Sequence, residues 1–274
     1  MRVVLGNEEI PVWEVTLFVY GSITVENTLR LSELKGFRLE DPFYSDIEIR
    51  RNRAVSGIEA TVTAYASTEN LAREAAILFF GQMLDALAIK IQQPLYLNFS
   101  DRQSSSRKTH DTLRRVRKDE WKEAFKEARL LALTETTFLR ALGWYRKGLY
   151  TEDPFDKFLA FWNSIEIVTG KYYPLVSEET IKGSKDQIKA CFKALWGECE
   201  NWPIIKGETN WVRDNYEIRK TIAHGTQPVT IETVKKVTQR ISTIKQVANT
   251  FLLEWREQKL SPQVPPELRD MFRY

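Results

Sequence analysis

Two side chains near the end of a predicted helix have the chemistry needed to act on a phosphate ester. The chain has two histidines, and one of them, His224, follows Arg219 after four intervening residues. An imidazole can donate or accept a proton near neutral pH. A guanidinium group can bind a phosphate anion and stabilise the charge that develops on it. RNA supplies its own nucleophile, the 2′-hydroxyl group, so we expect phosphodiester chemistry that needs neither a metal nor a cofactor.

The spacing of Arg219 and His224 restricts how they can meet. In one regular helix, residues five positions apart are about 500° around the axis, which leaves them roughly 140° off the same face. The two side chains can therefore point together only if the helix ends or unwinds before His224, and the following Gly225 favours such an end. A second interpretation stays open. A histidine at a helix C-terminus is favoured by the helix dipole, with Gly225 as the residue after the helix.

Glu166 is a carboxylate on the apolar side of another predicted helix. That helix is expected to begin at Asp153 as its N-cap, with Pro154 in the first position, and to reach Gly170. Three apolar residues precede Glu166 at steps of three or four, namely Phe155, Leu159 and Trp162. A buried unpaired carboxylate is costly, so Glu166 should find a cation or hydrogen-bond donors. Alternatively, it lies at the edge of the stripe and reaches water.

A basic segment separates the two halves of the chain. Residues 100–118 read SDRQSSSRKTHDTLRRVRK, with seven basic residues and two acidic ones. Clustered serines and the loss of periodicity predict an exposed loop or linker. It is either a solvated connector or an arm that contacts RNA phosphates. In the second case, the contacting residues would include Arg107, Lys108, Arg114 and Arg115.

No other motif in the sequence predicts a competing chemistry. Cys191 and Cys199 are eight residues apart with no histidine near them, so we expect two partly buried free thiols and no metal site. The sequence has no cluster of metal ligands, no glycine-rich phosphate loop and no Ser-His-Asp arrangement. We therefore predict that the protein uses no metal and no cofactor.

The composition is typical of a soluble globular protein. Of the 274 residues, 43% are apolar and 28% charged, which excludes a collagen, a disulfide scaffold and wholesale disorder. At about 150 residues per domain, this length predicts one large domain or two modest ones. A net charge of +3 does not by itself imply an acidic partner. The N-terminus does not read as a signal peptide, and the longest apolar run, Ala75–Phe80, is far shorter than a membrane span, so we expect a cytoplasmic protein.

Residues 1–100 predict an α+β domain. Two segments, at residues 13–19 and 58–64, alternate apolar and polar residues at the period of half-buried strands. A long helix is expected to follow from Ser67 as its N-cap, and a last strand is expected at residues 95–99. The apolar stripe of this helix is expected to contain Leu71, Ala75, Leu78 and Phe79.

Residues 119–258 predict an all-α antiparallel bundle of five helices. The first has one apolar stripe from Trp121 to Leu142, interrupted by Glu135. The helix from Asp153 comes second, and two more are expected at about 185–198 and about 208–223. The last, from about 230 to 258, has a seam of apolar residues that alternate steps of three and four. Residues 259–274 form a proline-rich tail.

The bundle resembles the HEPN superfamily, whose members have an Arg-x(4–6)-His motif. Arg219 and His224 match this motif at the end of the penultimate helix, and a long helix follows. The segment DPFDKFLAFWNSIEIVTG, residues 153–170, is similar to the acidic-residue helix of Apea-like HEPN proteins and of the MauJ-like family. The resemblance covers about residues 119–258 and implies an HEPN-like fold there.

The resemblance also implies a metal-independent endoribonuclease that acts as a dimer, with two motifs facing one cleft. Many HEPN proteins of this kind belong to defence or toxin–antitoxin systems. In this chain, His224 would be the acid/base and Arg219 the phosphate ligand, and Glu166 would orient them by pairing with Arg219. Asn163, one turn before Glu166, would support it. The implied partners are RNA, a second copy of the chain joined through the bundle, and a cognate antitoxin or effector protein.

Lys220 departs from the pattern of the superfamily. Active members often have Asn, Asp or His directly after the arginine, and a lysine removes that positioning acceptor although it can still contact phosphate. This favours a second hypothesis, a non-catalytic HEPN-fold module that binds RNA or protein. A third hypothesis is a regulatory subunit whose bundle packs on a separate effector.

Overall fold

The computed structural model describes residues 2–5, 8–32, 43–53, 55–98, 114–151, 153–177, 181–224 and 231–260. The chain folds as an antiparallel sheet region followed by helices, which makes it an α+β protein. The described residues form two compact units, which divide between Leu130 and Leu131.

Unit 1 is built on a six-stranded sheet in which every pairing is antiparallel. Five strands follow the order β1-β2-β6-β5-β4, and β7 also pairs with β2. The strands of this sheet are β1 (Arg2–Leu5), β2 (Glu8–Tyr20), β4 (Leu29–Ser32), β5 (Phe43–Arg51), β6 (Gly57–Tyr65) and β7 (Tyr96–Asn98). Two short strands, β3 (Ile23–Thr24) and β8 (Arg114–Arg115), form a separate parallel pair.

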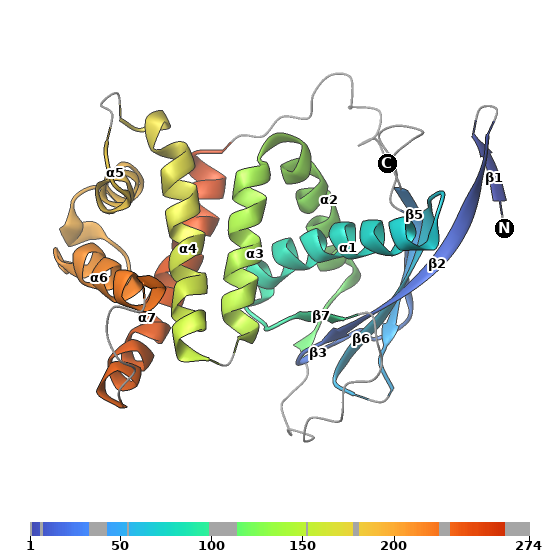
Figure 1. The fold of residues 1–274 in the computed structure, drawn as a ribbon, viewed down its shortest axis with the longest axis horizontal. Helices are drawn as coiled ribbons and strands as arrows, with labels where there is room; N and C mark the ends of the chain where they lie inside the picture. The colour runs from blue at the N-terminus through green and yellow to red at the C-terminus, as the bar shows by residue number, and fades with distance from the viewer. Residues whose placement is uncertain are drawn as a thin grey trace. The chain divides into compact units, whose positions relative to one another are not determined.

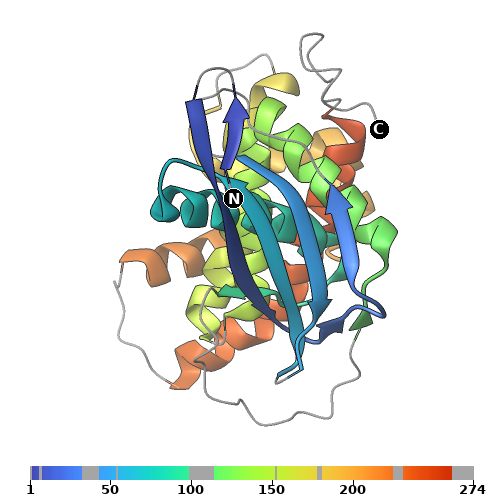
Figure 2. The ribbon, with the colours of Figure 1, turned by 90° about the vertical axis from the view of Figure 1, so that its right-hand side faces the viewer.

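The predicted alternating segments are the two central strands, and they pair with each other. Leu17 of β2 lies opposite Ala60 of β6, and Val19 lies opposite Ile58. All four side chains are buried, whereas Glu59 between them is only half-buried. Helix α1 (Glu69–Ile91) lies across one face of the sheet, as Figures 1 and 2 show. The period of two therefore identified both strands and the split between their faces.

Helix α1 differs in two details from the prediction. Its N-cap is Thr68 and not Ser67, because the Thr68 hydroxyl accepts a hydrogen bond from the backbone N–H of Leu71 at 3.3 Å. The predicted apolar stripe is also wrong in part, since Leu71 and Leu78 are exposed. Apolar residues surround most of this helix, and the buried side is instead formed by Ala72, Ala75, Ala76, Phe80, Met83, Leu84 and Leu87.

The boundary between the units lies inside a helix and not at residue 119. Helix α2 (Lys118–Thr134) begins in unit 1, where the ring of Trp121 stacks against Phe80 with centroids 6.4 Å apart. The ring of Phe125 meets the Phe80 ring edge-on, with centroids 6.0 Å apart. This aromatic cluster fixes the first turns of α2 to α1, so the sequence after 118 does not start a separate unit.

The stripe predicted for one helix belongs to two, so the described residues between 118 and 258 form six α-helices, whereas five were predicted. The break falls at Glu135, which is the N-cap of α3 (Thr136–Tyr150). The carboxylate of Glu135 accepts a hydrogen bond of 2.6 Å from the hydroxyl of Tyr172. A carboxylate is poorly placed inside an apolar stripe. At the break before α3, the Glu135 carboxylate has a hydrogen-bond donor, the Tyr172 hydroxyl.

Unit 2 is a helical assembly in which α4 packs against α3, α5, α6 and α7. Figure 1 shows α3 and α4 side by side, joined by a short connection. The helices are α4 (Pro154–Tyr172), α5 (Ser184–Trp196), α6 (Trp211–His224) and α7 (Ile231–Gln258), with two 3₁₀ turns at Tyr173–Leu175 and Cys199–Asn201. The core is rich in large aromatic rings, including Trp162, Phe192, Trp211, Phe251 and Trp255.

The start of α4 is as predicted, but its end is not. The side chain of Asp153 accepts hydrogen bonds of 2.9 Å from the backbone N–H groups of Phe155 and Asp156, and Pro154 occupies the first position. The helix continues past Gly170 to Tyr172, because Tyr172 is buried and anchored to Glu135. Tertiary contact thus overrides the tendency of the glycine to end the helix.

Two further predictions concern the linker and the cysteines. The end of the predicted linker is in part a strand, since Arg114 and Arg115 pair with Ile23 and Thr24. Residues 101–113 and 261–274 lie outside the described part of the chain.

Both cysteines are free, as predicted, and burial raises the pKa of the Cys191 thiol to about 12. Among the described helices, none is long and apolar enough to cross a membrane.

Candidate functional site

An ion pair joins the two helices that carry the predicted motif residues. Oε2 of Glu166 on α4 lies 3.3 Å from Nη2 of Arg219 on α6. The side chains are 19% and 28% exposed, respectively, so the pair lies at the edge of the core and is partly shielded from water. Glu166 therefore pairs with a cation, the guanidinium group of Arg219, and also reaches solvent. Each of the two interpretations of Glu166 applies in part. This is the contact that the resemblance implies, whereas the roles of the two residues remain predictions.

Aromatic packing one or two turns away positions this ion pair. Trp162 lies one turn before Glu166 on α4, and Trp211 lies two turns before Arg219 on α6. Both rings are buried, with centroids 6.2 Å apart. Because residues at steps of four share one helix face, the contact between the tryptophans aligns the faces that present Glu166 and Arg219.

Asn215, which the sequence motifs did not single out, lies one turn before Arg219 on the same face. Its side chain is fully buried, and its amide donates a 2.8 Å hydrogen bond to the backbone carbonyl of Trp211. The amide oxygen has no partner among the described residues, and neither does the buried Nε of Arg219. A buried polar group without a partner is unusual and costs free energy. The sequence did hold a signal, because Trp211, Asn215 and Ile218 follow helical spacing with a polar residue in the middle.

The backbone of α6 is helical through His224, which contradicts the expected end before that residue. A regular helix places the backbone of His224 roughly 140° around the axis from Arg219. Helical hydrogen bonding therefore persists although a glycine follows directly. The side chain of His224 and residues 225–230, with Gly225 and Pro228, lie outside the described part of the chain.

Lys220 is engaged by a carboxylate on its own helix. Its Nζ lies 2.6 Å from Oε2 of Glu217, and both side chains are about half exposed. The hydrogen bond from Lys220, together with its charge, lowers the pKa of Glu217, and the same hydrogen bond and the charge of Glu217 raise the pKa of Lys220. An anion that binds Lys220 must therefore compete with Glu217.

Asn163 lies three residues before Glu166 on α4 and is half-buried. Residues three apart are neighbours on a helix surface, so the amide is next to the carboxylate of the ion pair. The side-chain amide of Asn163 makes no hydrogen bond with any other residue that the structure describes. The position is compatible with the supporting role predicted for it.

The predicted RNA-contacting residues of the basic segment fall into two groups. Arg107 and Lys108, like His110, lie outside the described residues. Arg114 and Arg115 belong to unit 1 and already have acidic partners. Arg114 pairs with Glu120 at 2.5 Å, and Arg115 pairs with Glu26 at 2.8 Å. The charge of each of these two arginines is therefore already balanced in part by a carboxylate, which weakens its attraction for an RNA phosphate.

The described part of the chain has no group of three or more His, Cys, Asp or Glu side chains that could hold a metal ion. At the α4–α6 contact, the structure shows a guanidinium group paired with a carboxylate. No protein-family model matches the sequence, and neither a curated protein nor a solved structure matches the chain.

Proposed function

We propose that this protein is a metal-independent endoribonuclease of the HEPN type. The observation that supports this most is the 3.3 Å ion pair between Glu166 and Arg219, which links the acidic helix to the Arg-x4-His helix. A carboxylate that fixes one edge of the guanidinium group restricts its rotation and leaves its other N–H groups to bind a phosphate. The side chain of Arg219 is 28% exposed, so part of it can be reached from solvent.

In the proposed reaction, the 2′-oxygen of RNA attacks the adjacent phosphorus atom, and the bond from phosphorus to the 5′-oxygen breaks. The products are a 2′,3′-cyclic phosphate and a 5′-hydroxyl. Neutral His224 takes the proton from the 2′-hydroxyl, and protonated His224 gives a proton to the leaving oxygen. A dimer supplies one imidazole for each transfer. Because the backbone of His224 lies roughly 140° around α6 from Arg219 of its own chain, the proposed reaction places the phosphate between the two chains and not on one face of a single helix. Arg219 stabilises the negative charge on the phosphoryl oxygens.

The chemistry can be tested with a substrate that lacks the nucleophile. We expect the protein to cleave a labelled RNA strand and to leave the matching 2′-O-methyl strand intact, with cyclic phosphate at the new ends. Cleavage of the 2′-O-methyl strand, or 5′-phosphate ends, would exclude attack by the 2′-oxygen. Binding of both strands without cleavage would favour the second hypothesis below.

The second candidate is a non-catalytic module of the same fold that binds RNA or protein. Two observations favour it. The helical backbone of α6 extends through His224, and Lys220 is paired with Glu217 where active HEPN proteins often have an acceptor. A role in a defence or toxin–antitoxin system, with a second copy of the chain and a cognate partner, belongs to both candidates.

A further inference from the structure

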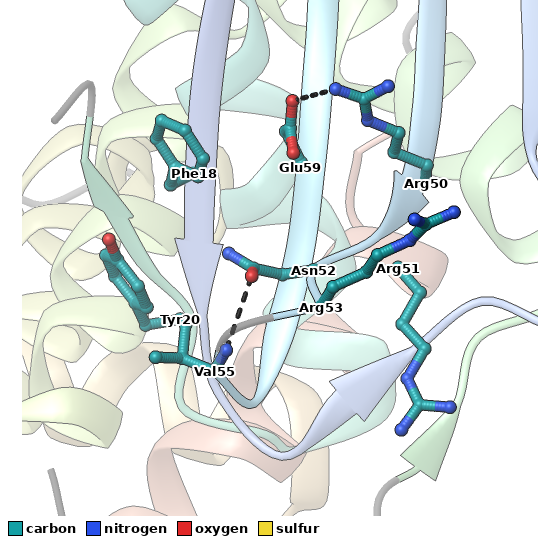
Figure 3. Close-up of a pocket in the computed structure, with 8 residues that line it drawn as sticks. All are labelled: Phe18, Tyr20, Arg50, Arg51, Asn52, Arg53, Val55 and Glu59. Carbon is teal, nitrogen blue, oxygen red and sulfur yellow. Dashed lines mark hydrogen bonds and ion pairs between the residues drawn. The ribbon is translucent and has the colours of Figure 1, made fainter. Parts of the chain in front are cut away.

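A hollow of about 540 Å³ opens on the face of the unit 1 sheet opposite α1. Figure 3 shows the residues that line it, namely Phe18, Tyr20, Arg50, Arg51, Asn52, Arg53, Val55 and Glu59. Side chains on a strand alternate between faces, so Phe18 and Tyr20 point away from the buried Leu17 and Val19. The volume lies within the range of about 300–1,000 Å³ that is typical of small-ligand pockets.

The hollow has a positive charge that the described residues do not neutralise. The guanidinium of Arg50 is bound to Glu59 across the two strands. Arg51 and Arg53 are both exposed, and neither has an ion-pair or hydrogen-bond partner among the residues that the structure describes. A second hollow of about 390 Å³ shares these three arginines. Its carboxylate, Glu26, is already paired with Arg115 at 2.8 Å.

Aromatic rings form the other side of the hollow. In Figure 3, Phe18 and Tyr20 lie on one side, and the guanidinium groups of Arg50 and Arg53 lie on the other. Tyr20 stacks with Tyr96 of β7, with centroids 6.4 Å apart and an interplanar angle of 27°. That contact holds the Tyr20 ring in place. Phe18 is half-buried, so part of it is open to a ligand.

We propose that this hollow binds a nucleotide, with the base against Phe18 or Tyr20 and the phosphate on Arg53, while Arg51 adds positive charge at the rim. A planar guanidinium group binds phosphate in a fork-like geometry, and base–aromatic stacking accepts any base. A bare anion would need the arginines but not the rings, whereas an apolar ligand would need the rings but not the arginines. The proposal is independent of the ribonuclease proposal, since the two sites share no residue.

The test uses the full chain and a 3′-fluorescein-labelled single-stranded DNA hexamer, which has no 2′-hydroxyl and so cannot undergo the proposed cleavage. Fluorescence anisotropy gives the dissociation constant for this strand and for a hexamer with the same phosphates but abasic sugars. Without bases to stack, the abasic strand should bind at least about five-fold more weakly. Competition with unlabelled AMP and ATP then distinguishes a free nucleotide from a strand as the tighter ligand, and either result supports the proposal.

Variants locate the site. Arg51→Gln with Arg53→Gln should weaken binding of the hexamer, and should lower the slope of log affinity against log salt by about 0.7 for each phosphate that is no longer neutralised. Tyr20→Leu and Phe18→Leu should weaken binding of the hexamer but not of the abasic strand. The control is Arg30→Gln, which removes an exposed arginine of the same sheet that is paired with Glu48 at 3.0 Å. Equal affinity for the two strands, or unchanged binding by the double arginine variant, would overturn the proposal.

Discussion

Glu166 and Arg219 face each other across the contact between α4 and α6, with Oε2 and Nη2 3.3 Å apart. The pair is polar, yet it lies beside the buried contact between Trp162 and Trp211. Less than a third of either side chain is exposed, so solvent screens their attraction only in part. The helix packing therefore depends on the ion pair as well as on the aromatic rings.

Removal of either charge should destabilise the protein. We expect Glu166→Gln and Arg219→Gln each to lower the free energy of unfolding by about 1–3 kcal/mol, because each leaves a partly buried charge without its partner. The double variant should lose less than the sum of the two. Urea denaturation measures all three. Strictly additive losses would mean that the side chains do not interact in solution. Arg213→Gln is the control, because its pair with Asp214 is exposed and should contribute at most about 1 kcal/mol.

Tyr172 should make the stability depend on alkaline pH. Burial first, and then its hydrogen bond to Glu135, raise the pKa of the Tyr172 phenol above its usual value. The unfolded state therefore loses this proton at lower pH than the folded state, so the contribution of Tyr172 is complete below about pH 10 and declines above it. Tyr172→Phe should remove this part of the pH dependence and lower stability at pH 8 by about 1–3 kcal/mol. Parallel stability profiles of the two proteins between pH 8 and 11 would contradict this explanation.

Cys191 should be unreactive in the folded protein. Burial raises the pKa of Cys191 to about 12, so almost none of it is thiolate at pH 8. Cys199 is only half-buried. In iodoacetamide labelling at pH 8, followed by mass spectrometry, native Cys199→Ser protein should stay unlabelled until urea unfolds it. Rapid labelling of Cys191 in that native variant would show that the core around α5 opens readily.

Two glycines in neighbouring helices should respond in opposite directions to alanine. A Cβ atom added to Gly148 of α3 would lie 2.7 Å from the Phe161 ring of α4, so Gly148→Ala should destabilise by about 1–3 kcal/mol through overpacking. At Gly170 the nearest atom is the Gln187 side-chain oxygen at 3.7 Å, which is an ordinary contact. Gly170→Ala should therefore stabilise α4 by up to about 1 kcal/mol. Thermal unfolding compares them, and a stable Gly148→Ala protein would mean that α3 and α4 pack less closely.

Local patterns predicted the elements well where one physical cause dominates. The strict alternation of β2 and β6 follows from one buried face, and Asp153 with Pro154 marks the start of α4 without help from the rest of the fold. Features that depend on distant partners were not predictable in the same way. The break at Glu135 is stabilised by Tyr172, and the buried face of α1 is selected by the sheet.

The candidate site shows the same difference between features that follow from a local pattern and features that depend on distant partners. The sequence singled out Glu166 and Arg219, and the structure places them in contact. It did not single out Asn215, whose burial depends on how α6 packs against its neighbours. Nor did it single out Arg51 and Arg53, which are distinguished by the absence of acidic partners among the described residues and by the rings of β2, which is separated from β5 by β6.

The most direct test of the proposed function is the cleavage rate of a labelled mixed-sequence RNA in excess EDTA. Wild type should cleave it, and removal of the acid/base in His224→Ala should reduce the rate by about 10²–10⁴-fold. Arg219→Ala should reduce it by about 10²–10³-fold, whereas Arg213→Ala, on the exposed side of the same helix, should match wild type. Cleavage by His224→Ala at the wild-type rate would contradict the account. So would the absence of cleavage by folded, dimeric wild-type protein.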